Sequence, residues 1–209
     1  MGNTIVFKAA EQTPITAMYF AHLCQQAGIP SGVINMVNGD GVVGASLAAH
    51  EGIDKVAFTG STAVGQSIRK STAGQGKKLT LELGGKSAFV VFEDADLDAA
   101  VEGLVDSIWF NQGEVCCAGS RLLVQAEVAE KLHLKIKARI KQLRLGLPLD
   151  KSIDLGSLVS KTQFERVSQM VNDGLKHGGE SFQACDIDAE KNLYPCLLYT
   201  SPSPRDNKA

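Results

Sequence analysis

Two adjacent cysteines, Cys116 and Cys117, lie in the polar stretch FNQGEVCCAGSR rather than in an apolar run. A buried structural cysteine normally has apolar neighbours, whereas Gly113 and Gly119 flank this pair. An unperturbed thiol has a pKa of about 8.5 and is largely protonated at neutral pH, so a nucleophile needs help from local dipoles or charges. The pair is either a catalytic nucleophile, whose loop N–H groups would also stabilise an oxyanion, or two inert thiols.

A glutamate lies inside a second chemical motif, LELGGKSA, where Glu82 stands between two leucines of a predicted strand. An isolated buried carboxylate is costly, so one interpretation is a residue with a backbone partner or an outward-facing strand position. The functional interpretation is a general base whose pKa is raised by apolar surroundings, which suits activation of water near neutral pH.

A third motif, FTGSTAVG, places Gly60 at the end of an apolar strand and Ser61 at the start of a helix, with Gly65 on its first turn. Backbone N–H groups at a helix N-terminus attract phosphate, and a residue without Cβ lets the phosphate approach closely. An ordinary strand-turn-helix has the same pattern, and the motif is neither G-x-G-x-x-G nor a P-loop. Phosphate binding and a purely structural turn both fit these residues.

Strands and helices must alternate to position these motifs. Strand-like runs separated by single helices predict parallel pairing through right-handed crossovers, hence an α/β sheet with helices on both faces. Such sheets bind ligands at the carboxyl ends of their strands. The expected strands are 3–9, 32–39, 54–60, 77–85, 87–92 and 120–125, and the expected helices are 13–30, 41–52, 61–74, 94–111, 126–143 and 160–178.

Composition excludes several classes of function. The 21 basic and 23 acidic residues are mixed along the chain, so no basic stripe indicates a nucleic-acid partner. No apolar run reaches the roughly 18 residues of a membrane span. The five cysteines have no repeating spacing and the four histidines show no ligand spacing to the Cys-Cys pair, so we expect neither a disulfide framework nor a metal site. A cytoplasmic protein is expected, with an organelle matrix as the alternative.

In this order, FKAAEQTP, FTGSTAVG, LELGGKSA and NQGEVCCAGSR resemble the NAD(P)-dependent aldehyde dehydrogenase superfamily. The likeness runs from about Asn3 to Tyr194 and covers under half of a family-length chain. It implies a parallel Rossmann-like sheet with helices on both faces, followed by the first part of an α/β catalytic domain.

The resemblance also implies residue roles. Cys116, rather than Cys117, matches the catalytic nucleophile, and Glu82 matches the general base. Cofactor positions are matched by Lys8 and Glu11 (adenosine ribose), Gly60, Ser61 and Gly65 (pyrophosphate turn), and Leu83 (near the nicotinamide).

The implied reaction oxidises an aldehyde to a carboxylic acid through a cysteine thiohemiacetal and thioester. A carboxylate at Glu11 should accept ribose hydroxyls and repel a 2′-phosphate, which favours NAD over NADP. The resemblance implies a small aldehyde as substrate and a homo-oligomer for the full-length protein.

The sequence also departs from the family pattern. The upstream Asn of the oxyanion hole and the downstream E-x-F-G-P glutamate are absent, and Trp109 stands where a smaller or aliphatic residue is commoner. We therefore expect little turnover from these 209 residues alone. A non-catalytic aldehyde dehydrogenase-like scaffold, an inactive fragment and a cysteine redox sensor stay as alternatives.

Three segments are expected along the chain. Residues 1–85 are assigned to part of a dinucleotide-binding domain and residues 86–195 to the start of a catalytic domain that carries the nucleophile. Ser-Pro repeats beside a charged end cannot continue a packed element, so residues 196–209 are expected to form a disordered or foreign tail.

Overall fold

The computed structural model describes residues 2–200, and the chain divides into two compact units, Met1–Gly84 and Gly85–Ala209. The sequence placed a boundary after residue 85, and the structure divides the chain after Gly84. Assignment of the two units to cofactor binding and catalysis stays a prediction.

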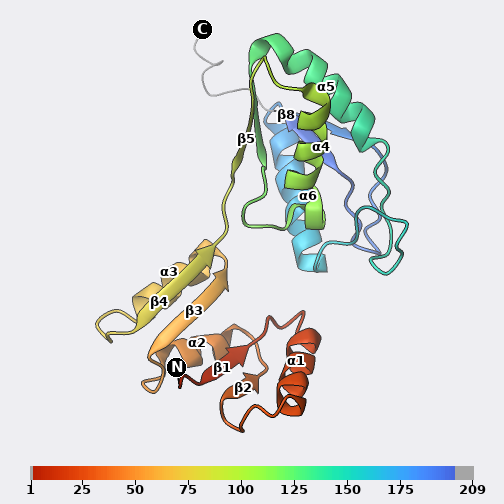
Figure 1. The fold of residues 1–209 in the computed structure, drawn as a ribbon. Helices are drawn as coiled ribbons and strands as arrows, with labels where there is room; N and C mark the ends of the chain where they lie inside the picture. The colour runs from red at the N-terminus through yellow and green to blue at the C-terminus, as the bar shows by residue number, and fades with distance from the viewer. Residues whose placement is uncertain (1, 201–209) are drawn as a thin grey trace. The chain divides into compact units, whose positions relative to one another are not determined.

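The first unit alternates strands and helices as the sequence predicted. Two parallel pairs form, β1 with β2 and β3 with β4, and α3 packs against both β3 and β4 (Figure 1). The elements are β1 (Ile5–Lys8), α1 (Ile15–Gln26), β2 (Ile34–Val37), α2 (Gly41–Ala49), β3 (Lys55–Gly60), α3 (Thr62–Ser71) and β4 (Lys78–Leu83).

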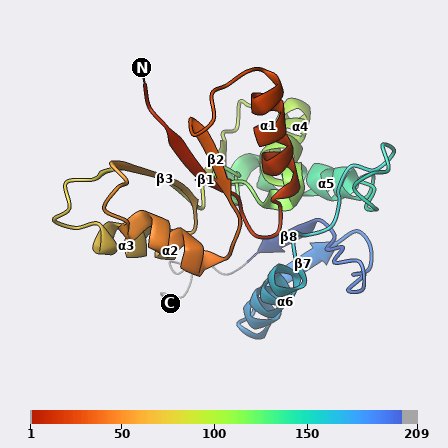
Figure 2. The same ribbon diagram turned by 90° about the horizontal axis from the view of Figure 1, so that it is seen from below.

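The second unit continues the alternation through the Cys-Cys loop. Strands β5 and β6 pair in parallel, and β7 and β8 pair antiparallel. Figure 2 shows β7 and β8 side by side next to α6. The elements are β5 (Ala88–Val91), α4 (Leu97–Ile108), the 3₁₀-helix η1 (Phe110–Gly113), β6 (Arg121–Val124), α5 (Ala126–Ile140), α6 (Lys161–Lys176), β7 (Glu180–Gln183) and β8 (Leu197–Thr200).

The α/β class is confirmed, and the predicted parallel pairing is found between β1 and β2, between β3 and β4, and between β5 and β6. Within residues 2–200 the strands pair two by two rather than in one continuous sheet. Each of these strands has a single hydrogen-bonded neighbour, and its other edge is open.

The structure differs from the sequence prediction at residues 196–200. Cys196 is 3% exposed, and β8 pairs with β7, so Leu197 lies opposite Gln183. The apolar run LLYT is long enough for a short strand, and the Ser-Pro repeats that suggested disorder begin only after it. The rest of the expected tail, 201–209, lies outside the described residues.

One hydrophobic core organises the second unit. Helices α4 and α5 lie against β5 and β6, and the chain before β8 closes the cluster through Cys196. The buried members are Val91, Val101, Leu104, Trp109, Leu132, Ile136, Ile140, Leu155 and Cys196. This core supports the polar loop in which Cys116 and Cys117 lie, because Trp109 belongs to the cluster and directly precedes that loop.

Candidate functional site

The turn after β3 gathers four of the residues singled out in the sequence. Gly60 ends β3 and lies opposite Leu83 of β4 in the parallel register. Ser61 caps α3, and its Oγ accepts from the Val64 N–H at 3.3 Å. Gly65 is buried, and a Cβ built there would lie 2.7 Å from Leu83 Cδ2. A Cβ at this position would therefore have to displace the Leu83 side chain.

This arrangement fits an anionic ligand. The first N–H groups of a helix have no partner within the helix, and Ser61 satisfies one of them. The others lie beside Gly60, a residue without a side chain. The positive end of the helix dipole favours negative charge at the same place. The turn can thus hold a phosphate group, and a dinucleotide pyrophosphate is the ligand that the sequence predicted for it.

Lys8 lies at the end of β1 and is held by backbone oxygens. Its Nζ donates to the Ala9 carbonyl at 2.7 Å and to the Gly39 carbonyl at 3.0 Å. Glu11 lies in the exposed turn that follows. Among residues 2–200, no hydrogen bond or ion pair joins either side chain to the turn after β3. Lys8 thus fastens the end of β1 to the residues before α2, a structural role that the sequence pattern did not indicate.

Glu82 points outward from β4. Exposure alternates along this strand, with Leu81 and Leu83 partly buried and Glu82 exposed, and Thr59 lies opposite Glu82. The outward-facing strand position considered from the sequence is therefore the one observed within the first unit. The apolar surroundings expected for a buried general base are absent from this unit, because period-two alternation directs the carboxylate to the face opposite the leucines. The catalytic role of Glu82 stays a prediction.

The cysteine loop is a strained turn with exposed thiols. Cys116 and Cys117 are both exposed and free. The loop begins with three successive left-handed residues, Asn111 (φ 49°), Gln112 (φ 57°) and Gly113 (φ 75°). A Cβ at Gly113 would lie 2.9 Å from the Ile108 carbonyl oxygen. Non-glycine residues in this conformation each cost on the order of 1–3 kcal/mol, so tertiary contacts must hold the loop.

Contacts on both sides of the cysteines supply that restraint. After them, the buried Gly119 donates its N–H to the Ser107 carbonyl of α4 at 3.0 Å. Before them, the Val159 N–H donates to Glu114 Oε2 at 3.3 Å. With its amide oriented to pair donors with acceptors, Gln112 accepts the Gly156 N–H at 2.8 Å. The loop thus presents two thiols on a backbone anchored at both ends.

Glu114 and Gln112 are residues that the sequence analysis missed. Partial burial raises the pKa of the Glu114 carboxyl, while hydrogen bonds from Val159 and Gln163 act in the opposite direction. The sequence feature that could have identified Glu114 is the spacing Gly113-Glu114-x-Cys116, which places a carboxylate two residues before the thiol. Its partners lie about 45 residues further along the chain, and no local pattern identifies them.

The predicted catalytic pair spans the two units. Glu82 belongs to Met1–Gly84 and Cys116 to Gly85–Ala209, so their pairing stays a prediction. No group of three or more possible metal ligands occurs in the part of the chain that the structure describes. Across residues 2–200, none of the helices is both long and apolar enough to cross a membrane.

The chain is a Rossmann-like α/β chain that carries the turn after β3 (the glycine turn, residues 60–65) and the cysteine loop (residues 110–120). Comparison with known proteins assigns its family. The model of the "Aldehyde dehydrogenase family" matches residues 1–203. The chain belongs to the aldehyde dehydrogenase family.

Individual relatives agree with this assignment. An aldehyde dehydrogenase of Emericella nidulans is 48% identical over 179 residues, which are 85% of this chain and 36% of that protein. The crystal structure of PnpE in complex with nicotinamide adenine dinucleotide matches with a TM-score of 0.93 at 37% identity, over 99% of this chain and 43% of the other. An NADP-dependent enzyme of E. coli matches with a TM-score of 0.89 at 35% identity, over 94% and 41%. The chain therefore spans well under half the length of these relatives.

Proposed function

We propose that this chain supplies the nucleophile and part of the cofactor site of an NAD-dependent aldehyde dehydrogenase. The observation that carries the proposal is the exposed Cys116 on an anchored, left-handed turn in a member of this family. An exposed thiol on a fixed backbone can meet a substrate carbon without a rearrangement of the loop. The proposed substrate is a small aldehyde.

The covalent step belongs to Cys116. Its thiolate attacks the aldehyde carbon and forms a thiohemiacetal, whose oxyanion accepts hydrogen bonds from loop N–H groups. A bound NAD would supply the acceptor for the hydride of this carbon, and Cys116 would then carry the acyl group as a thioester. Glu82 then takes a proton from water, and the resulting attack on the thioester releases the carboxylic acid and the free thiol.

Residues of the first unit would hold the dinucleotide. The N–H groups at the start of α3, with Gly60 and Ser61, fit the pyrophosphate, and Leu83 would lie near the nicotinamide. Lys8 and Glu11 would contact the adenosine ribose. The exposed Glu11 carboxylate repels a 2′-phosphate, which favours NAD over NADP.

Calorimetric titration of the 209-residue chain with NAD and with NADP tests the cofactor preference. We expect weak binding with NAD preferred, and Glu11→Gln should narrow the preference. Equal or tighter binding of NADP to the unsubstituted chain would remove Glu11 from its proposed role.

Thiol mapping and an activity assay test the nucleophile. Brief treatment with low iodoacetamide should modify Cys116 ahead of Cys117, as read by mass spectrometry. NADH formation from short and long aldehydes, with Cys116→Ala beside it, should be slow, because the two motif residues missing from this sequence contribute to the rate. Fast turnover that Cys116→Ala abolishes would support the nucleophile and contradict the expected slow rate. Preferential modification of Cys117 would overturn the assignment.

The proposal includes a homo-oligomer, which the family resemblance supports, and a location in the cytoplasm, with an organelle matrix as the alternative. Sedimentation velocity of the protein that carries this segment tests the assembly. A single monomeric species at micromolar concentration would contradict it.

A further inference from the structure

We infer that Glu114 is a positioning residue, whose side chain fastens the cysteine loop to the start of α6 and thereby selects Cys116 over its neighbour for reaction. The inference rests on the proposed role of Cys116. It concerns a residue that touches neither substrate nor cofactor and acts through the backbone of the loop.

The loop needs such an anchor because its own backbone does not favour the observed shape. Asn111, Gln112 and Gly113 all adopt left-handed φ values immediately before Glu114. Gln112 carries a side chain that disfavours this region, whereas asparagine and glycine tolerate it. Local hydrogen bonds join Glu114 N–H to the Asn111 carbonyl at 3.0 Å and Asn111 Nδ2 to the Glu114 carbonyl at 3.3 Å. These bonds close the turn on itself but do not attach it to the rest of the unit.

The Glu114 carboxylate provides the attachment. Its Oε2 accepts the Val159 N–H at 3.3 Å, and the Gln163 side chain also hydrogen bonds to it. Val159 comes just before Ser160, which caps α6 by accepting the Gln163 N–H at 3.2 Å. The carboxylate thus lies at the N-terminus of a 16-residue helix whose own first turn contains no acidic residue.

Charge favours this position. The N-terminus of a helix carries partial positive charge, and a carboxylate there stabilises it. In α6 the negative charge comes from the cysteine loop rather than from the helix itself. Burial raises the pKa of this carboxyl, and the Val159 and Gln163 hydrogen bonds favour its ionised form. The loop and the helix therefore stabilise each other through a single side chain.

Gln112 adds a second attachment to the same segment, through the Gly156 N–H at 2.8 Å. Gln112 and Glu114 flank Gly113 and reach residues 156 and 159, so the loop is held at two points before the thiols. Removal of one of these two attachments should let the loop move, so that the accessibilities of the Cys116 and Cys117 thiols become more alike. The measurable consequence is a change in the relative reactivity of the two cysteines.

The test compares iodoacetamide modification rates of Cys116 and Cys117 in the 209-residue chain by mass spectrometry. In the unsubstituted chain Cys116 should react first. Glu114→Ala should lower the ratio of the two rates by about fivefold, the effect of one net hydrogen bond. Glu114→Gln should keep the ratio within about twofold, because the amide oxygen still accepts from Val159.

Glu165→Ala is the matched control. Glu165 is another carboxylate in the first turns of α6, it pairs with Lys161 at 4.0 Å, and its side chain is 64% exposed. Its removal should leave the ratio unchanged. A loss of helix stability alone would move the ratio in Glu165→Ala and Glu114→Ala alike, so equal changes in both would overturn the inference.

The outcomes separate this inference from the proposed function. Faster modification of Cys117 in the unsubstituted chain contradicts the role of Cys116. Faster modification of Cys116 together with an unchanged ratio in a folded Glu114→Ala contradicts only the role of Glu114. If Glu114→Ala fails to fold, Gln163→Ala decides, since loss of its amide should lower the ratio by a smaller factor and an unchanged ratio overturns the inference.

Discussion

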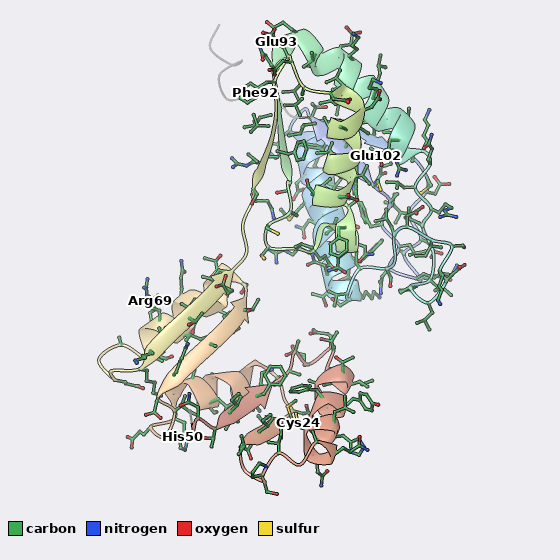
Figure 3. All side chains as sticks on the ribbon, viewed as in Figure 1. Cys24, His50, Arg69, Phe92, Glu93 and Glu102 are labelled. Carbon is green, nitrogen blue, oxygen red and sulfur yellow. The ribbon has the colours of Figure 1, made fainter. Side chains whose placement is uncertain are left out.

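The two units of this chain differ in which apolar side chains they bury. In the second unit, large aliphatic side chains from α4, α5 and β5 form one buried cluster with Trp109 and Cys196. In the first unit, the buried apolar residues are small or isolated, namely Ala9, Cys24, Ala48 and Ile68. Cys24 lies on the side of α1 that faces the β1–β2 pair (Figure 3). The cysteine loop therefore rests on a packed core, and the glycine turn does not.

The first unit also leaves large apolar side chains exposed. Ile15 is 78% exposed and Val42 is 71% exposed. An apolar groove of about 500 Å³ lies between α1 and the β1–β2 pair. Parallel strands are normally covered on both faces. Because apolar side chains stabilise a fold in proportion to the area they bury, the exposed side chains of this unit contribute little to its stability. We expect the second unit to be the more stable of the two.

The largest expected effect sharpens that contrast. Ile136 is 1% exposed in the core of the second unit, so Ile136→Ala should destabilise it by about 2–5 kcal/mol. Urea unfolding followed by the fluorescence of Trp109 reports on this unit, because Trp109 is the one tryptophan of the sequence. Leu134→Ala is the control from the same helix, since Leu134 is 64% exposed, and it should change stability by less than about 0.5 kcal/mol.

The corresponding change in the first unit is Ile68→Ala, at a residue that is 9% exposed. Hydrogen exchange of α3 peptides should show a smaller loss of protection than α5 shows in Ile136→Ala. A loss at Ile68 as large as that at Ile136 would break the comparison between the units.

The second prediction concerns close packing within the first unit. Gly65→Ala places a Cβ against Leu83, at 2.7 Å from Cδ2, and should cost about 1–3 kcal/mol while weakening dinucleotide binding. Gly41→Ala is the matched control, because a Cβ there meets nothing within 4 Å. Hydrogen exchange and calorimetry measure both effects. Unchanged NAD binding in Gly65→Ala would separate the glycine from the proposed cofactor site.

A third prediction uses the buried thiol of the second unit. Burial raises the pKa of Cys196 from 9.0 to about 12. A raised pKa means that the folded state keeps its proton longer, so this contribution is present below pH 9 and is lost as pH rises toward 12. Between pH 8 and 10 the loss should be about 1 kcal/mol.

Urea midpoints over this pH range, compared with Cys196→Ala, isolate that contribution. The substituted chain should lose less stability on alkalinisation than the unsubstituted one. Parallel pH profiles would show that the thiol is not buried in solution. In native labelling at pH 8, Cys116 and Cys117 should react while Cys196 stays protected.

The smallest expected effect lies on the surface of the second unit. Arg139 on α5 donates to Glu102 on α4, with Nε–Oε1 at 2.8 Å and Nη2–Oε2 at 3.1 Å (Figure 3 labels Glu102). The Arg139 hydrogen bond holds the pKa of Glu102 below its ordinary value of 4.5. A lowered pKa contributes stability above pH 4.5, and the contribution is lost as pH falls through the folded-state value.

Glu102→Gln should therefore lower the urea midpoint slightly at pH 7, by less than any change above, since exposed ion pairs contribute little. The midpoints of the two chains should converge below pH 4.5. A difference that grows at low pH would contradict the assigned pairing.

Local interactions explain what the sequence alone determined. Periodicity and capping act over a few residues. They determined the α/β class, the order of the six α-helices and the first six strands, and the start of a helix at Ser61. The Cys-Cys loop was also placed correctly between a helix and a strand, because glycine and polar residues interrupt both periods. The family resemblance rested on the same short motifs, and the family model that matches residues 1–203 confirms it.

Tertiary structure decided what depends on residues distant in the sequence. The Lys8 contact with the Gly39 carbonyl and the Glu114 contact with Val159 join groups that no local pattern relates. The pairing of β7 with β8 likewise connects segments that are separated by a loop. A local pattern specifies which backbone shape a segment prefers, whereas the contacts between segments follow from how their buried faces pack, and that is settled only when the chain has folded.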